Sequence, residues 1–146
     1  MSEAASTTTE QTTPYLELSE RLRRNPPMSP AAVAEMLGVT MKKTDLGHEA
    51  SGAGSDGVEF AKLVFRFLPN GNPNVFVITL PDGAGPSPAT VRESFGDLRL
   101  LAGPRGKSPE DEMIIGRDEY WGTLSFGFAE KARENLRTIV FSFGQK

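Results

Sequence analysis

The chain has 146 residues, a length typical of one domain or of two very small ones. It contains no cysteine, which excludes disulfides, thiolate metal sites and thiol nucleophiles, and its net charge of −3 gives no basic footprint for nucleic acid. No apolar run approaches the roughly 20 residues that a membrane-spanning helix needs.

The first segment, residues 1–14, consists mainly of Ser, Thr, Glu and Ala and offers nothing to bury, so we expect a disordered tail. It lacks the charged start and apolar centre of a signal peptide, which favours a cytoplasmic location for the chain as written. A signal removed before residue 1 would instead place the protein in the periplasm or outside the cell.

An amphipathic helix is expected next, within residues 15–25. Tyr15, Leu18 and Leu22 recur at helical spacing, so they share one face. Pro26 follows and ends the helix, because proline cannot continue the backbone hydrogen bonds.

Two ten-residue segments, 29–38 and 87–96, share Ser, Pro, Ala, Val, Glu and a final Gly at the same places. Each has the signals of a complete short helix, since Ser can cap the free N–H groups, Pro suits the first turn and Gly can end it. We therefore expect two similar helices.

An apolar hairpin is predicted after each helix, with strands 59–67 and 75–80 in the first half and 120–128 and 137–143 in the second. The expected core face alternates at period two, and its aligned positions are Leu63, Phe65, Phe67, Phe76, Ile78 and Leu80 with Leu124, Phe126, Phe128, Ile139, Phe141 and Phe143. The sequence thus predicts an α+β fold of two tandem repeats, residues 26–83 and 84–146, each a short helix packed on an antiparallel sheet.

The second face of these strands mixes small polar, β-branched and charged residues. If the two sheets lie side by side, these faces form one open surface. Two placements remain for Trp121, which lies either on this surface or under the helix at 15–25. The candidate protein-binding residues, taking the first placement, are Trp121, Arg66, Lys62, Val64, Thr123 and Ser125.

The Ser-Pro helix start, the Val three residues later, the closing Gly and the aromatic antiparallel hairpin together resemble a known group. They are similar to the tandem-repeat beta-lactamase inhibitory protein and the small outer-membrane assembly lipoproteins, in sequence over 28–38 and 87–96 and by pattern over 59–80 and 119–143. The resemblance implies a duplicated α+β architecture and a function in protein binding. The chain departs from the group in having neither the inhibitor's disulfides nor a lipid-attachment cysteine.

Candidate catalytic and metal-binding residues are few. Gly106, Lys107 and Ser108 match only the end of a phosphate-binding loop, because the motif needs a Gly at the position that Leu101 occupies. His48 lies in an expected Gly/Ser-rich loop at 45–57, where we expect its side chain to be exposed. No metal ligand set and no cofactor are predicted.

An acidic stretch covers residues 110–119 and overlaps a second expected long loop, at 102–118. The best function class is a non-enzymatic protein-binding module, such as a bacterial inhibitor or immunity protein that binds an enzyme or toxin through the open surface and the loops. The net charge adds an expected preference for a basic partner. Two alternatives stay open: a small hydrolase that uses the acidic loop, and a secretion-linked protein with a Ser/Thr-rich N-terminal export segment. The oligomeric state is not predicted.

Overall fold

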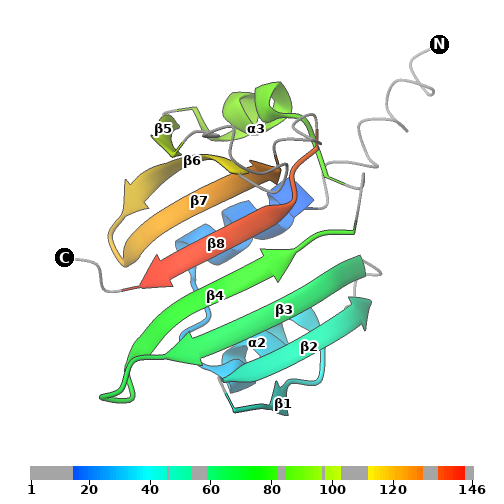
Figure 1. Cartoon of the computed structure of the whole chain (residues 1–146), viewed down its shortest axis with the longest axis vertical. Helices are drawn as coiled ribbons and strands as arrows, with labels where there is room; N and C mark the ends of the chain where they lie inside the picture. Colours follow the sequence, from blue (N-terminus) through cyan, green and yellow to red (C-terminus); the bar gives the residue numbers. More distant parts are fainter. Residues whose placement is uncertain are drawn as a thin grey trace.

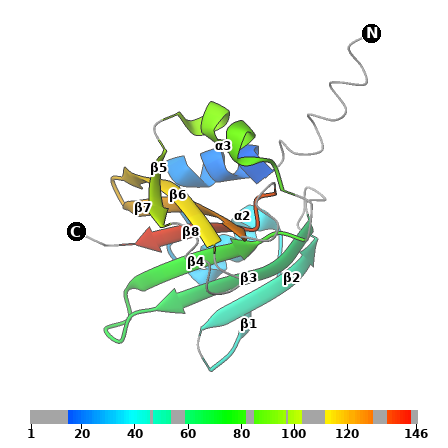
Figure 2. The same cartoon turned by 45° about the horizontal axis from the view of Figure 1, so that its top comes forward.

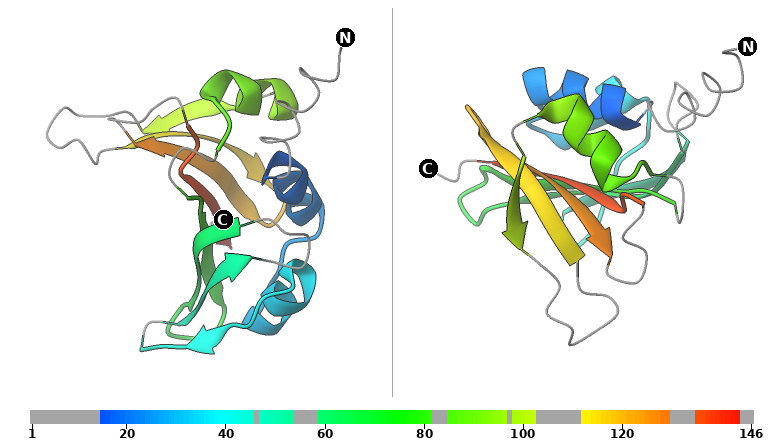
Figure 3. Two further views of the ribbon diagram at one scale, coloured as in Figure 1. Left: turned by 90° about the vertical axis from the view of Figure 1, so that its right-hand side faces the viewer. Right: turned by 90° about the horizontal axis from the view of Figure 1, so that it is seen from above.

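The structure is a computed structural model that describes residues 15–45, 47–53, 59–81, 85–96, 98–102, 112–129 and 135–143. Its described part is α+β, with three helices and one eight-stranded antiparallel sheet in the order β1-β2-β3-β4-β8-β7-β6-β5 (Figure 1). All three helices lie on one side of the bent sheet, and no helix of the described residues covers its other side (Figures 2 and 3). The expected tail at 1–14 lies outside the described residues.

The helices begin and end close to their sequence signals. The N-terminal helix spans residues 15–24, α2 spans Pro30–Leu37 and α3 spans Pro88–Phe95. The hydroxyls of Ser29 and Ser87 accept hydrogen bonds from backbone N–H groups in the first turns of α2 and α3. Within the described residues, no helix combines the length and the apolar composition needed to cross a membrane.

The strands of the first half are β1 (Lys42–Lys43), β2 (His48–Ala53), β3 (Glu59–Phe67) and β4 (Pro73–Thr79). Those of the second half are β5 (Arg99–Ala102), β6 (Glu112–Glu119), β7 (Gly122–Ala129) and β8 (Thr138–Phe143). Each half therefore presents a helix followed by four sequential antiparallel strands. The two halves join where β4 pairs with β8.

The expected long loops at 45–57 and 102–118 are wrong where two of these strands, β2 and β6, form. Residues 48–53 pair with β3 as β2, and residues 112–119 pair along their whole length with β7 as β6. The two short outer strands, β1 and β5, extend the sheet further at its edges.

The core lies between the sheet and the helices, and the predicted aromatic residues occupy it. Phe65, Phe126 and Phe141 are fully buried, as the period-two pattern predicts. Phe67 is the exception in the predicted core face, because it is 38% exposed at the end of β3. Phe65 also contacts Phe76 and Phe143, with ring centroids 6.1 Å apart in both pairs.

Strand register follows the alignment of the two halves. Leu63 lies opposite Ile78 in β3 and β4, and the aligned residues Leu124 and Phe141 lie opposite each other in β7 and β8. The central β4–β8 ladder is symmetric under the same alignment, with the pair Val77–Val140 at its midpoint. Aligned sequence positions thus occupy corresponding sheet positions.

Candidate functional site

The open side of the sheet carries a continuous row of paired residues across all eight strands. Antiparallel partners point to the same side of a sheet, so the ladder places on this side the row Lys42, Glu49, Val64, Val77, Val140, Ser125, Gly116 and Arg99. Two flanking rows complete what we call the open face: Arg66, Val75, Ser142, Thr123 and Asp118, and Lys62, Thr79, Thr138, Gly127 and Ile114.

The centre of the open face is neither a core nor a solvated surface. Val64, Val77 and Val140 lie side by side and are all half-buried, although no described helix covers them. Threonine and serine residues surround them and add hydroxyl groups that can donate or accept hydrogen bonds. Such a mixed patch can bury apolar area against a partner and still form polar contacts at its margin.

Charged side chains lie mainly toward the margins of the open face, and positive charge predominates. Lys42, Lys62, Arg66 and Arg99 oppose Glu49 and Asp118, which gives a net charge of +2 on these three rows. Two ion pairs form among these residues: Lys62 Nζ lies 3.7 Å from Glu49 Oε1, and Arg99 Nη2 lies 3.2 Å from Asp118 Oδ1.

Arg66 differs from these paired cations. It is exposed, and it forms no ion pair with any described residue. Its guanidinium group therefore remains available to an anionic group of a partner.

In the second half of the chain, part of the open face is covered by the Leu101 side chain. A Cβ atom placed on Gly116 would lie 2.8 Å from the Leu101 side chain, so Leu101 folds over this glycine. Ser125, the neighbour of Gly116 in β7, is only 8% exposed. Of the predicted binding residues, Lys62, Arg66, Val64 and Thr123 therefore remain accessible on the open face, whereas Ser125 is buried.

Trp121 is not on the open face. Of the two placements that the sequence left open, the structure has the one under the N-terminal helix, so the assignment of Trp121 as an open-face contact residue is wrong. It lies in the turn at residues 120–121 rather than in a strand, so the period-two alternation does not reach it. The indole is 6% exposed, and its Nε1 donates to the backbone oxygen of Arg23 at 2.8 Å. The N-terminal helix therefore covers Trp121, while its neighbour Tyr120 is 80% exposed.

The acidic stretch does not form a cluster where the structure describes it. Asp118 and Glu119 are adjacent in β6 and point to opposite faces, with Asp118 paired to Arg99 and Glu119 paired to Arg23 and Arg117. They cannot act together on one substrate atom. Glu110, Asp111 and the segment Gly106–Ser108 lie outside the described residues.

His48 lies on β2, not in a loop. Its ring contacts Phe67 edge to face at a centroid distance of 6.1 Å, and its Nδ1 is buried without a hydrogen-bond partner among the described residues. No group of three or more potential metal ligands occurs in the described part of the chain.

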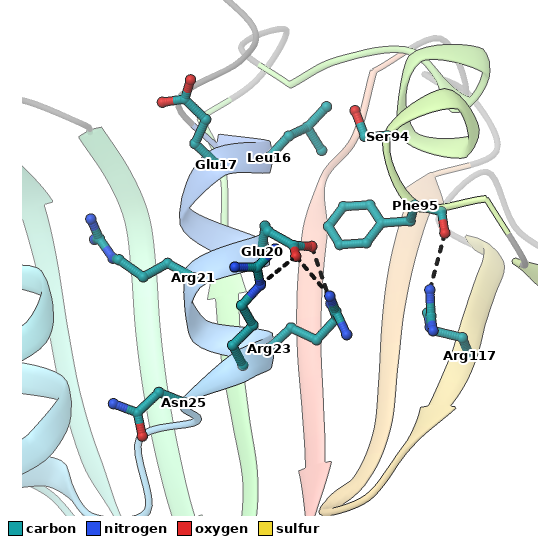
Figure 4. Close-up of a pocket in the computed structure, with 10 residues that line it drawn as sticks. Leu16, Glu17, Glu20, Arg21, Arg23, Asn25, Ser94, Phe95 and Arg117 are labelled. Atoms are coloured by element: carbon teal, nitrogen blue, oxygen red, sulfur yellow. Dashed lines mark hydrogen bonds and ion pairs between the residues drawn. The ribbon is translucent and has the colours of Figure 1, made fainter.

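A second site, which sequence reasoning missed, lies on the helix side. The N-terminal helix and the end of α3 border a groove of about 810 Å³, and Arg117 of β6 lies below the end of α3 (Figure 4). The described lining residues are Leu16, Glu17, Glu20, Arg21, Arg23, Arg24, Asn25, Ser94, Phe95 and Arg117. The basic run at 21–24 was the available sequence signal, but only the fold brings Arg117 beside it.

An ion-pair network lines this groove. Arg23 donates to both carboxylate oxygens of Glu20, at 3.1 and 2.7 Å, and its Nη1 lies 3.3 Å from Glu119. Arg117 lies 2.8 Å from the other oxygen of Glu119 and donates to the backbone oxygen of Phe95 at 3.0 Å. The network connects the N-terminal helix to β6 and to the end of α3.

Comparison with known proteins gives no match to a family model, to a curated protein or to a solved structure. The two sites just described are therefore the candidate functional surfaces of the chain. The open face extends across the sheet and mixes apolar and charged residues. The groove is smaller, and arginines dominate its charge.

Proposed function

We propose that the chain is a non-enzymatic protein-binding module, of the inhibitor or immunity-protein type, and that the open face is its contact surface. The observation that carries this proposal is the row Val64, Val77 and Val140, which is half-buried although no helix of the described residues covers it. Burial of these side chains against a partner would remove apolar area from water, and Arg66 beside them supplies an uncompensated charge.

We further propose that the two halves are tandem repeats. The shared order of helix and four strands supports this, and so does the register, because aligned residues occupy corresponding positions around the Val77–Val140 pair. Duplication would also account for the breadth of the open face, since joining two four-stranded sheets edge to edge produces one continuous surface. This architecture agrees with the resemblance to the tandem-repeat inhibitory protein.

The partner that fits this surface presents acidic side chains around an apolar centre. The net charge of −3 favours a basic partner, but the open face itself carries +2 on its three rows. Local charges within a Debye length dominate an interface. Asp118 is paired with Arg99, and Glu119 faces the helices, so neither adds to the open face an unpaired negative charge that would attract the expected basic partner.

The test compares matched charge reversals on the two sides of the sheet. Arg66→Glu changes the open face, and Arg92→Glu makes the same change on the exposed surface of α3. A partner is first captured from an extract of the source cells and purified, and its affinity for each folded variant is then measured. We expect Arg66→Glu to weaken binding at least about tenfold and to make the remaining binding less sensitive to salt, because it replaces an attraction to the acidic partner by a repulsion that salt screens. Arg92→Glu should leave the affinity unchanged.

A third variant, Val77→Lys, tests the apolar centre. It should weaken binding because it removes apolar contact and introduces a charge that must be desolvated. Its binding should stay more sensitive to salt than that of Arg66→Glu, because the attraction between Arg66 and the acidic partner remains. If both open-face variants fold and bind as tightly as the parent, the open face is not the contact surface. If the purified partner is an enzyme, its activity in the presence of one equivalent of the chain tests the inhibitor assignment.

A further inference from the structure

The groove between the N-terminal helix and α3 lies on the other side of the sheet from the open face, and it has the dimensions of a small-molecule site. Its volume of about 810 Å³ lies within the range of roughly 300–1,000 Å³ that is typical of ligand pockets. Leu16 and Phe95 supply apolar walls from the two helices, and their side chains are drawn at its border in Figure 4.

The charge of the groove is opposite to that of the chain. Among the described residues that line it, four arginines oppose two glutamates, which gives +2 in a chain of net charge −3. Glu119, which lies behind the lining and pairs with Arg23 and Arg117, reduces this excess to +1. A hollow with a positive excess and apolar walls concentrates anions locally, because the low-dielectric walls focus the field.

Two guanidinium groups of the groove, those of Arg23 and Arg24, already pair with Glu20 before any ligand arrives. Arg23 is held by Glu20 and Glu119, so its side chain is already ordered in the folded chain and loses little conformational entropy when a ligand binds. Arg24 shares one Glu20 oxygen with Arg23 through its Nε at 2.8 Å, and this is its only side-chain interaction with described residues. Its side chain is 73% exposed, so its two terminal nitrogens remain open to an additional anion.

We propose that this groove binds a small organic anion. Its carboxylate or phosphate head accepts hydrogen bonds from the two terminal guanidinium nitrogens of Arg24, beside Arg23, and its apolar body packs against Leu16 and Phe95. The carboxylate and phosphate alternatives share the planar, bidentate hydrogen bonding that a guanidinium group favours. The proposal is independent of the open face, so this site can be occupied with or without a protein partner.

Trp121 provides a reporter at the groove. It is the only tryptophan of the chain, and its indole Nε1 is bonded to the backbone of Arg23, one of the lining residues. Three probes of similar size are titrated into the full chain: phenylacetate, phenyl phosphate and the uncharged phenylacetamide. Calorimetry gives the Kd, and the change in indole emission localises the binding.

At least one of the two anions should bind saturably with a Kd at or below about 1 mM, while the amide should not bind at the same concentrations. Which anion binds more tightly identifies the head group. Arg24→Gln, an exposed substitution, should raise this Kd at least about fivefold, and Arg92→Gln on the outer surface of α3 should leave it unchanged. Equal binding of the amide, no binding of either anion at about 10 mM, or an unchanged Kd in Arg24→Gln would each overturn the proposal.

Discussion

The indole nitrogen of Trp121 donates a hydrogen bond to the backbone carbonyl of Arg23, with 2.8 Å between the two atoms. This carbonyl belongs to the last turn of the N-terminal helix, where backbone oxygens have no partner within the helix. The same indole packs on Phe141 and Phe143, at ring-centroid distances of 5.5 and 5.6 Å. Trp121 therefore fixes the end of the helix over the second half of the sheet.

Replacing Trp121 by Phe tests this role. The substitution retains most of the apolar packing but leaves the Arg23 carbonyl without its donor, so we expect the free energy of unfolding to fall by about 1–3 kcal/mol. Urea denaturation measures the change. Tyr120→Phe is the matched control, because Tyr120 is 80% exposed and its hydroxyl contact to Arg24 is long at 3.4 Å. A loss in the control as large as in Trp121→Phe would contradict the assignment.

The aromatic core gives a graded prediction. Phe65→Ala, Phe126→Ala and Phe141→Ala each remove a fully buried ring, so each should lower the free energy of unfolding by about 3–5 kcal/mol. Phe67→Ala removes a ring that is 38% exposed, and we expect it to cost less than about 2 kcal/mol. Equal losses at Phe65 and Phe67 would show that exposure does not set these costs.

The sequence predicts the central strands and the helices because their patterns are local and strong. β3 spans the expected residues 59–67, and the helices α2 and α3 begin at the predicted Ser-Pro pairs. The outer strands lack such patterns. β1 has two residues and β5 has four, and β2 contains small and polar residues, so their pairing depends on the strands already in place.

The two candidate sites also differ in how far the sequence predicts them. Lys62, Val64 and Arg66 follow from period-two alternation in β3, and the structure places them on the open face as expected. The turn at 120–121 interrupts the alternation before Trp121, which is why the strand pattern could not decide between its two placements and why its assignment to the open face is wrong. The groove was not predictable, because Arg23 and Arg117 are far apart in sequence and are joined only through Glu119.

The ion pairs of Glu20 predict a dependence of stability on pH. Hydrogen bonds from Arg23, chiefly, and from Arg24 hold the pKa of Glu20 below its ordinary value of 4.5. A carboxyl group whose pKa is lowered by folding stabilises the protein above the unfolded pKa, and this contribution is lost as the pH falls through the folded pKa. Glu20→Gln should therefore be less stable than the parent at neutral pH, and the difference should shrink below about pH 4.5.

Urea denaturation at several pH values checks this prediction. Glu20 is 35% exposed, so the difference should be small and should decrease further in salt. Glu17→Gln is the control on the same helix, since Glu17 forms no ion pair with a described residue. A constant difference between Glu20→Gln and the parent from neutral pH to about pH 3 would contradict a role for the charged pair.

The start of β7 gives the last prediction. Gly122 follows the turn at 120–121 with φ +151°, a conformation that favours glycine, and a Cβ atom there would collide with the backbone oxygen of Ser142 in β8. Gly122→Ala must therefore push β7 away from β8 or strain the turn. Gly71 has φ +90° in the β3–β4 turn, but a Cβ atom there would meet nothing within 4 Å. Gly71→Ala thus imposes backbone strain without a collision.

We expect Gly71→Ala to cost about 1 kcal/mol and Gly122→Ala to cost at least about 3 kcal/mol. For a chain of this length, each kcal/mol corresponds to a shift in Tm of roughly 2–4 °C, so calorimetric melting resolves the two variants. Because Trp121 precedes Gly122 directly, the collision should also disturb the indole contact with Arg23 and shift the emission of Trp121. Equal Tm values for the two variants would mean that β7 and β8 are not as closely apposed at Gly122 as the structure places them.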